Sequence, residues 1–377
     1  MAHSRRTFGL GAFAGMFGLA GAARAAAAGP TRDRNLRLAD QPEDYKALGI
    51  GQEIQVSEDG RRTEGRPEDF EWWYFDGLLE DGSVVVIWFG DNWFYGSHKR
   101  AISIDITPPG GKPRRVMKTF EEPGTFARDR ADIRIGPHRF EGDLKTYRIH
   151  IDAAQFGGTG CNLVLRQRVA SYRPATGHML SGDRFFAWLV AVPEGDVSGD
   201  LTIDGVTKAV SGSGYHDHNW GNVSPRDLFD GWWWGRARIG THTTIASQLY
   251  GRRDLGGVNI NLLYVGDEGS VKVNAFGRDV IATEGQAIRH PDPKHDRPIA
   301  GSIVFATRAG DVVQFNASDQ LLTSANLLDD APAAIRTFAQ LAGMKPWYTR
   351  FKSQVSLGLR GQPAEKGDGT LERFEFK

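Results

Sequence analysis

The chain lacks the residues and motifs that define several large classes of protein. Its only cysteine, Cys161, excludes an intramolecular disulfide and any zinc site built on cysteines. Lysine plus arginine and aspartate plus glutamate each number 46, and this balance argues against a general nucleic-acid binder. There is no phosphate-binding loop, no G-x-S-x-G elbow and no dinucleotide fingerprint. We therefore expect no nucleic-acid partner and no cofactor.

Long hydrophobic runs are also missing. The longest weakly apolar stretch is rich in glycine and alanine, follows the pair Arg5–Arg6, and ends before four alanines at 25–28. It is too short and too poor in leucine and isoleucine for a bilayer span. The pattern predicts a twin-arginine (Tat) signal over residues 1–28, with cleavage sites of the A-x-A kind. We expect the twin-arginine translocase as a transient partner, a periplasmic or secreted location, and no stable membrane span after signal removal.

What the chain has in quantity is glycine, at 47 residues, together with many short apolar stretches. Residues 84–89 form an uninterrupted apolar run, and Ile102, Ile104 and Ile106 alternate with polar residues as in a half-buried strand. Turn signals separate such stretches, and no alternation of strands with helices appears. The fold class is therefore predicted to be all-β, built from antiparallel barrels or sandwiches.

The length of the chain and a stretch with proline and glycines near its middle suggest two domains. Residues 29–66 are polar and are predicted to form an extended arm, followed by a first domain over 67–199 and a second over 200–377. The boundary depends on Pro193 and the glycines after it. One short helix is expected near the C-terminus, around 331–342, with an aspartate cap and Pro332 in its first turn.

The most concentrated chemistry lies at residues 212–222, with the sequence GSGYHDHNWGN. On an extended strand, His216, His218 and Trp220 would share one face, and Tyr215, Asp217 and Asn219 the other. Two aromatic runs, EWWYFD at 71–76 and GWWWG at 231–235, hold five of the ten tryptophans. Aromatic walls beside a few titratable groups indicate a pocket for a large, mostly apolar molecule.

The titratable groups suggest acid–base chemistry on an unsaturated substrate. A carboxylic acid among tryptophans has a raised pKa and can stay protonated at neutral pH, a part that either Asp217 or Asp76 could play. A neighbouring imidazole, His216 or His218, would orient the acid or take the proton back. The predicted substrate-binding side chains are hydrogen-bond donors and indoles that stack on a conjugated system: Tyr74, Tyr215, Trp73, Trp220 and Trp233.

Structural alternatives stay open for the same residues. An aromatic cluster such as the GWWWG run is more often core packing than a binding wall. Asp217 could be a buried carboxylate that ties loops together through backbone N–H groups. His216 and His218 could ligate a metal, but H-x-H is a weak signal and nothing marks a third ligand among His242, Asp76 and His178. We expect no metal.

The motifs YHDHNWG at 215–221 and EWWYFD at 71–76, with VPEGDVSG at 192–199 and WYTRF at 347–351, carry a resemblance to a known group. They resemble the carotenoid 1,2-hydratase (hydroxyneurosporene synthase) superfamily, which includes kievitone hydratase, lipocalin-like Diels–Alderases and secreted bacterial members. The resemblance spans about residues 66 to 376. It implies two lipocalin-like β-domains with a ligand cavity near their junction, and it adds Tyr348 to the candidate binding residues.

Two functions follow as expectations. The first is an exported enzyme acting on a hydrophobic terpenoid, polyketide or phenolic substrate, either a hydratase (hydro-lyase) or a cyclase or isomerase without cofactor. The second is a non-catalytic periplasmic carrier of an apolar ligand. The titratable cluster beside the aromatic runs favours the enzyme.

Overall fold

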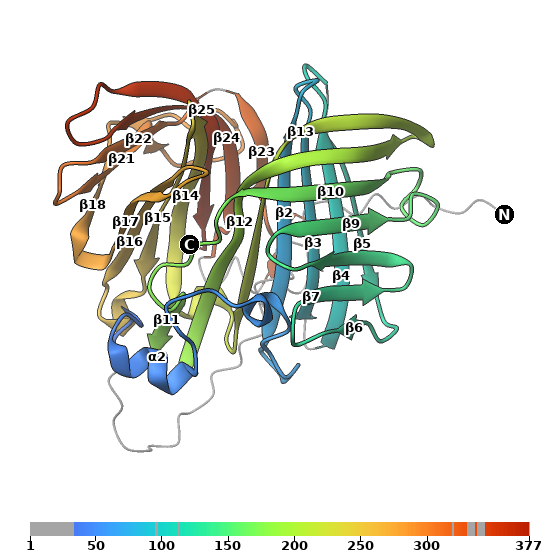
Figure 1. The fold of residues 1–377 in the computed structure, drawn as a ribbon, viewed down its shortest axis with the longest axis horizontal. Coiled ribbons are helices and arrows are strands. Elements are labelled where there is room, and N and C mark those ends of the chain that lie inside the picture. The colour runs from blue at the N-terminus through green and yellow to red at the C-terminus, as the bar shows by residue number, and fades with distance from the viewer. Residues whose placement is uncertain are drawn as a thin grey trace.

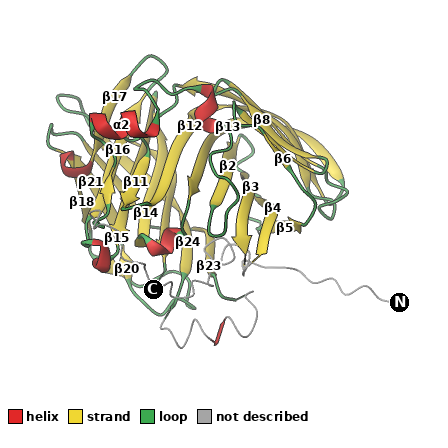
Figure 2. Cartoon of the chain, turned by 90° about the horizontal axis from the view of Figure 1, so that it is seen from below, coloured by secondary structure: helices red, strands yellow, loops and turns green. Residues whose placement is uncertain are grey.

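The predicted all-β class is confirmed by a computed structural model of the chain. The structure describes residues 34–94, 97–111, 113–318, 320–329, 336–337 and 344–376. Within them, two large antiparallel sheets lie side by side (Figure 1), and helices are few and short (Figure 2). The predicted signal at 1–28 and nearly all of the helix predicted at 331–342 lie outside the described residues.

The first sheet has the strand order β5-β4-β3-β2-β13-β12-β10-β9-β8-β7-β6, with β11 on β12 and β1 on β11. It curls around a core in which side chains from distant strands meet, such as Phe89 and Phe140, whose ring centroids are 5.7 Å apart. Its strands are β1 (Arg37–Leu38), β2 (Phe70–Leu79), β3 (Val84–Phe94), β4 (Ser97–Thr107), β5 (Arg114–Phe120), β6 (Thr125–Phe126), β7 (Ala131–Ile135), β8 (His138–Gly142), β9 (Thr146–Ile151), β10 (Gly160–Val169), β11 (His178–Ser181), β12 (Arg184–Ile203) and β13 (Val206–Gly221).

The second sheet has the order β17-β16-β15-β14-β25-β24-β22-β21-β18, with β23 on β24. It nearly closes on itself, because β16 also contacts β18 and β21, and its core holds Trp233, Phe305 and Phe315. Its strands are β14 (Phe229–Ile239), β15 (His242–Gly251), β16 (Asn259–Gly266), β17 (Val271–Phe276), β18 (Val280–Glu284), β21 (Ser302–Thr307), β22 (Val312–Asn316), β23 (Leu321–Asn326), β24 (Trp347–Gly358) and β25 (Glu365–Glu375). A separate pair joins β19 (Ala287–Ile288) and β20 (Ile299–Ala300).

The long hairpin of β12 and β13 is the last part of the first sheet, and the chain changes sheet between β13 and β14. Its turn falls at Asp204 and Gly205, both with positive φ, as the Asp–Gly pair predicts. The strand at 206–221, which the sequence-based division places after the boundary, therefore pairs inside the first sheet with β2 and β12.

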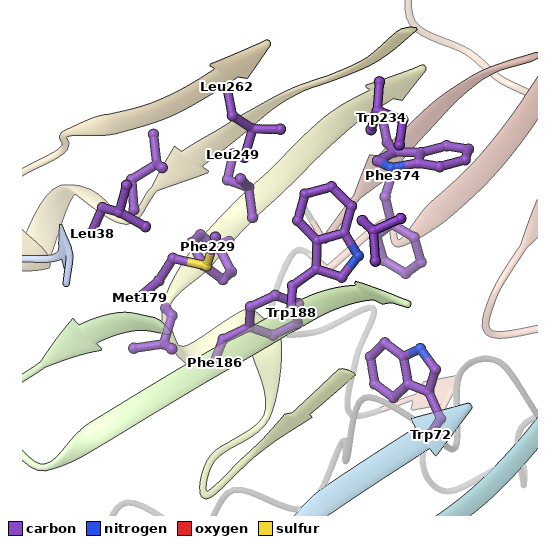
Figure 3. Close-up of a cluster of buried hydrophobic side chains, with 14 of the residues drawn as sticks. Leu38, Trp72, Met179, Phe186, Trp188, Phe229, Trp234, Leu249, Leu262 and Phe374 are labelled. Atoms are coloured by element: carbon purple, nitrogen blue, oxygen red, sulfur yellow. The ribbon is translucent and has the colours of Figure 1, made fainter. Parts of the chain in front are cut away.

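The two sheets meet through a third apolar cluster, shown in Figure 3. Trp72, Phe186 and Trp188 reach it from the first sheet, and Trp234 and Phe374 from the second. A packed aromatic layer of this kind, buried from both sides, holds the two sheets in one arrangement. The candidate site lies within this layer.

The arm predicted at 29–66 is more structured than expected. It contains helix α2 (Pro42–Leu48) and the 3-10 turn η1 (Val56–Asp59), and Leu36 is fully buried against the intersheet cluster. Over the described part of the chain, no helix combines the length and apolarity that crossing a bilayer requires.

Candidate functional site between the sheets

The alternation predicted for the central motif is present on β13. His216, His218 and Trp220 point toward one side of the first sheet, where His216 and His218 enter its core. Asp217 and Asn219 point to the opposite side and line a cavity between the sheets. One strand therefore supplies polar groups to two separate environments.

The cavity has a volume of about 110 Å³ and aromatic walls. The apolar lining residues are Trp72, Trp88, Met179, Phe186, Trp188, Trp232, Trp234, Leu249 and Phe374. The lining residues that carry polar groups are Tyr74, Asp217, Asn219, Ser247, Tyr348 and Glu372. Within this lining, Asp217 and Glu372 are the two carboxyl groups, and they enter from different sheets.

Asp217 is held by three side-chain donors. Its Oδ2 accepts hydrogen bonds from Trp188 Nε1 at 2.9 Å and from the Tyr215 hydroxyl at 2.7 Å, and its Oδ1 accepts one from Asn219 Nδ2 at 2.8 Å. Burial raises the pKa of Asp217 to about 6, although these donors, and the nearby His216, favour the charged form. Asp217 is thus ionised at neutral pH and can accept a proton when the pH falls slightly below neutral.

Glu372 on β25 is the second carboxyl group. Its Oε1 accepts a hydrogen bond from the Tyr348 hydroxyl at 2.8 Å and lies 3.4 Å from Arg350 Nε. Burial raises the pKa of Glu372 to about 7; Arg350 opposes the shift, and the negative charges of Asp76 and Asp217 add to it. The sequence analysis missed this residue. The signal in the sequence is alternation, because Glu372 and Phe374 are two positions apart and share one face of an extended strand.

Asp76 lies beside the cavity but not in its lining. Arg350 Nη2 contacts its Oδ2 at 2.5 Å, and Arg236 Nη2 donates to its Oδ1. Burial would raise the pKa of Asp76, but the two guanidinium groups outweigh it and lower the pKa. Arg236 also donates to Glu194 at 3.0 Å, so these charges join the first sheet to the second. This environment favours a permanently ionised anchor over a proton donor at Asp76.

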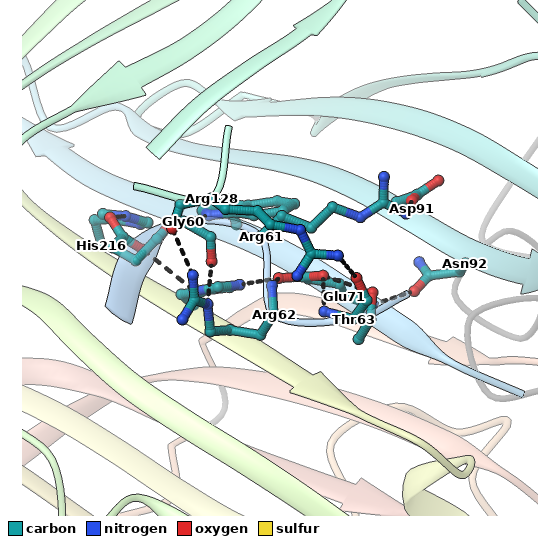
Figure 4. Close-up of polar contacts among 12 residues, drawn as sticks. Gly60, Arg61, Arg62, Thr63, Glu71, Asp91, Asn92, Arg128 and His216 are labelled. Atoms are coloured by element: carbon teal, nitrogen blue, oxygen red, sulfur yellow. Dashed lines mark hydrogen bonds and ion pairs between the residues drawn. The ribbon is translucent and has the colours of Figure 1, made fainter. Parts of the chain in front are cut away.

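His216 and His218 belong to a buried network inside the first sheet, part of which is drawn in Figure 4. His216 Nε2 lies 3.1 Å from Asp59 Oδ2, and its Nδ1 lies 2.8 Å from the Tyr74 carbonyl oxygen. His218 Nε2 lies 2.9 Å from Glu71 Oε1. Glu71 also accepts hydrogen bonds from the backbone of Arg62 and Thr63 and from the Thr63 hydroxyl. His216 thereby ties β13 to η1, and His218 ties it, through Glu71 on β2, to the segment that follows η1.

The structure separates the predicted binding residues into two groups. Tyr74 and Tyr348 line the cavity with Asp217, and Tyr215 reaches it through its hydrogen bond to Asp217. The indoles predicted to bind substrate lie elsewhere: Trp73 stacks on His218 at 4.5 Å, Trp220 lies 4.7 Å from the same ring, and Trp233 is in the second core. Their neighbours Trp72, Trp232 and Trp234, which the sequence analysis did not select, stand at the cavity instead.

Among the residues that the structure describes, no group of three or more histidine, cysteine, aspartate or glutamate side chains is arranged to hold a metal ion. His178, one of the three third ligands considered, packs against Trp220 at 5.5 Å and hydrogen-bonds the Thr176 carbonyl oxygen.

An all-β protein with an aromatic, carboxyl-bearing cavity between two sheets agrees with what sequence comparison finds. The chain belongs to the carotenoid hydratase family: a sequence profile of carotenoid hydratase CrtC matches residues 82–281, more than half of the 377 residues. The chain is similar to hydroxyneurosporene dehydrogenase of Chlorobaculum tepidum, at 28% identity over 215 residues, covering 45% of this chain and 54% of the relative. It thus spans about half the length of that curated relative.

Solved structures show the same fold. A protein assigned as AttH from Nitrosomonas europaea matches with a TM-score of 0.59 and 17% identity, covering 87% of this chain and 98% of its own. CghA in complex with Sch210972 matches with a TM-score of 0.57 and 16% identity, over 82% and 89% of the two chains. Kievitone hydratase from Nectria haematococca matches with a TM-score of 0.56 and 11% identity, over 86% and 93%.

Proposed function

We propose that this protein is an enzyme that hydrates or cyclises an unsaturated, largely apolar small molecule without a cofactor. The observation that carries the proposal is the pair Asp217 and Glu372, two carboxyl groups with pKa values raised to about 6 and about 7 in one aromatic cavity. Membership of the carotenoid hydratase family supports hydration. Paired carboxyl groups with separated pKa values are how proteins divide acid and base roles.

The pKa order assigns the roles. Between pH 6 and 7, Glu372 holds a proton while Asp217 is ionised. In hydration, Glu372 would donate its proton to one carbon of the double bond, and the facing indoles would stabilise the resulting cation. Water would add to the other carbon and lose a proton to Asp217, and solvent would then restore both groups. In cyclisation, the same acid would act and water would be excluded.

The cavity volume limits how the substrate binds. Pockets that enclose a drug-sized ligand measure roughly 300–1,000 Å³, whereas this cavity is about 110 Å³. It suits the reacting end of a longer molecule, or a compact ring system of a few carbons. A terpenoid, polyketide or phenolic substrate would place one unsaturated end among Trp188, Trp234 and Phe374.

The direct test is an incubation of the purified protein with a panel of isoprenoids and polyenes, analysed by mass spectrometry. A product heavier by one water identifies a hydratase, and an isomer of unchanged mass identifies a cyclase. The rate should depend on pH with two limbs, because Asp217 must be ionised and Glu372 protonated. We expect the acid limb near pH 6 to disappear in Asp217→Asn and the alkaline limb near pH 7 in Glu372→Gln.

The same incubation tests the second candidate function, a non-catalytic carrier. The feature that favours a carrier is that Asp217 is fully engaged by three donors, as a structural carboxylate would be. A carrier would bind members of the panel and return them unchanged.

We also infer export by the twin-arginine route to the periplasm or beyond, because Arg5–Arg6 precede an alanine-rich stretch with small residues at its end. Replacing both arginines by lysine should retain the precursor in the cytoplasm, since lysine lacks the planar guanidinium fork. Cell fractionation with immunoblotting measures this. Normal processing of the double variant would contradict twin-arginine export.

A further inference from the structure

The Tyr74 hydroxyl is a hydrogen-bond donor that its protein surroundings leave uncommitted. Tyr74 lies on β2, is half-buried and lines the cavity. Its oxygen accepts a hydrogen bond from Arg350 Nη1 at 2.8 Å. A phenol that accepts one hydrogen bond still has its own hydrogen to donate. Among the described residues no acceptor for that hydrogen is found, so an atom inside the cavity is the natural partner.

Arg350 makes this donor a strong one. It is buried, and its other contacts are with Asp76 and Glu372, so the guanidinium is fixed in place. A cation that donates a hydrogen bond to the oxygen of a phenol polarises the phenol O–H bond, and this strengthens the hydrogen bond that the phenol donates. The arrangement would stabilise a partial negative charge on an acceptor oxygen opposite Tyr74.

The Tyr74 hydroxyl lies close to the carboxyl groups proposed to act on the double bond. Tyr74 and Asp217 are direct cross-strand partners in the pairing of β2 with β13, so their side chains stand next to one another on the cavity face. The nearby Glu372 shares Arg350 with Tyr74. An oxygen bound by Tyr74 would therefore lie within a few bonds of a double bond placed between the two carboxyl groups.

We propose that the cavity is built for an oxygenated unsaturated substrate, whose carbonyl or hydroxyl oxygen, next to the reacting double bond, accepts a hydrogen bond from Tyr74. A carbonyl conjugated with the double bond suits the arrangement best, because the hydrogen bond would withdraw electrons from that bond and let water attack its far carbon directly. In that case water would lose a proton to Asp217 and Glu372 would protonate the other carbon, without the cation that an isolated alkene requires. A pure hydrocarbon would leave the Tyr74 donor unpaired in an apolar cavity, which is unfavourable. The position of the reacting bond rests on the proposed function, whereas the oxygen-binding donor does not.

Binding measurements test this without turnover. Geranial, geraniol and myrcene share a ten-carbon skeleton and differ in their oxygen, and quenching of tryptophan fluorescence reports their affinities. On Tyr74→Phe, the affinity ratio of geranial to myrcene should fall by about 5- to 20-fold, the effect of one buried hydrogen bond. The ratio between wild type and variant cancels the different hydrophobicities of the probes.

Ser247→Ala is the matched control. Ser247 also lines the cavity, but its hydroxyl already donates to the Trp233 carbonyl oxygen at 2.7 Å. We expect the ratio of geranial to myrcene to stay within about twofold of wild type in this variant, because Ser247 has no donor to offer a ligand. Geranyl methyl ether checks the direction of the bond in the wild type, since it can accept a hydrogen bond and cannot donate one.

The outcomes separate cleanly. An equal loss of affinity for all three probes in Tyr74→Phe, or no loss, would mean that Tyr74 and Arg350 only join the sheets, and the inference would be wrong. If the affinity of geranyl methyl ether changes between wild type and Tyr74→Phe by the same factor as that of myrcene, the inference would also be wrong. Failure of the wild type to bind any probe would overturn it as well. A preserved oxygen preference without turnover on any substrate would refute the proposed enzyme and leave the oxygen-binding donor standing.

Discussion

The two faces of β13 both carry buried, hydrogen-bonded polar side chains, but one face lies in the core of the first sheet and the other lines the cavity. On the face inside the first sheet, His218 contacts Glu71, which also accepts hydrogen bonds from the backbone of Arg62 and Thr63 and from the Thr63 hydroxyl. The side chains of His218 and Glu71 are fully buried. On the cavity face, Asp217 also accepts three hydrogen bonds, yet its pKa is raised to about 6 and it borders empty space. Hydrogen bonding alone therefore does not distinguish a structural cluster from a reactive one.

The difference lies in what surrounds the polar groups. Beside Glu71, His218 and the donors of Arg62 and Thr63 contact the carboxylate, and the apolar side chains of the first core, such as Trp73, are buried around them. Beside Asp217 and Glu372, aromatic walls exclude water, and the hydrogen bonds that replace it, one of them from the Trp188 indole, do not offset burial, so the charged forms are disfavoured. Buried polar groups become useful for chemistry where burial outweighs their hydrogen bonds and a cavity adjoins them.

The largest expected effect is on turnover and comes from a substitution on the cavity face of β13. Asp217→Asn should lower turnover by about 10²–10⁴-fold, the usual contribution of a general acid or base. Stability should change little, because Asn219 can turn its amide to present oxygen to the new amide nitrogen. Steady-state kinetics and thermal melts measure both quantities. A variant with wild-type turnover would remove Asp217 from the mechanism, and a large fall in melting temperature would make it a structural residue.

The matching change on the opposite face should have the reverse effect. Glu71→Gln places an amide N–H among four donors, with no flip that could satisfy them, so unfolding should become easier by about 3 kcal/mol. Turnover per folded molecule should stay within about threefold of wild type. Urea unfolding curves and active-site titration test this. Lost turnover at unchanged stability would mean that the histidine face takes part in catalysis.

The pH dependence of stability sharpens the comparison. The folded-state pKa values of Asp217 and Glu372 lie above the ordinary 3.8 and 4.5, at about 6 and about 7. The folded protein therefore binds more protons between these limits, and each carboxyl group should reduce stability by about 1.4 kcal/mol per pH unit as pH rises through its window. Urea unfolding at pH 5 and pH 8 measures the loss. Glu372→Gln should lose less than wild type, and an identical loss would contradict the raised pKa.

The smallest expected effect concerns Tyr215, which supports Asp217 from behind the cavity. Its hydroxyl hydrogen bond lowers the pKa of Asp217 against the effect of burial. Tyr215→Phe should shift the acid limb of the rate profile to higher pH by less than about one unit, with less than a tenfold loss of maximal turnover. A shift to lower pH would contradict this. Trp188→Phe removes another donor to the same oxygen and should act in the same direction.

Much of this molecule could be predicted from the sequence. Period-2 patterns predicted the antiparallel all-β class and the two faces of residues 215–220, because alternation along a strand is a local property. The motifs also indicated the family before any comparison. Asp217, Tyr74 and Tyr348, which the sequence analysis named as candidate site residues, line the cavity, and their roles remain predictions.

Tertiary structure decided which face of each strand meets the other sheet. In the runs at 71–76 and 231–235 the sequence shows adjacent tryptophans, but it does not show which of them faces a core and which faces a cavity. The sequence analysis therefore named Trp73 and Trp233, which lie in the two cores, whereas Trp72, Trp232 and Trp234 line the cavity. Glu372 reaches Asp217's cavity from a strand more than 150 residues later in the chain. The raised pKa values of both carboxyl groups come from burial between two sheets, and burial is a property of packing that strand periodicity does not contain.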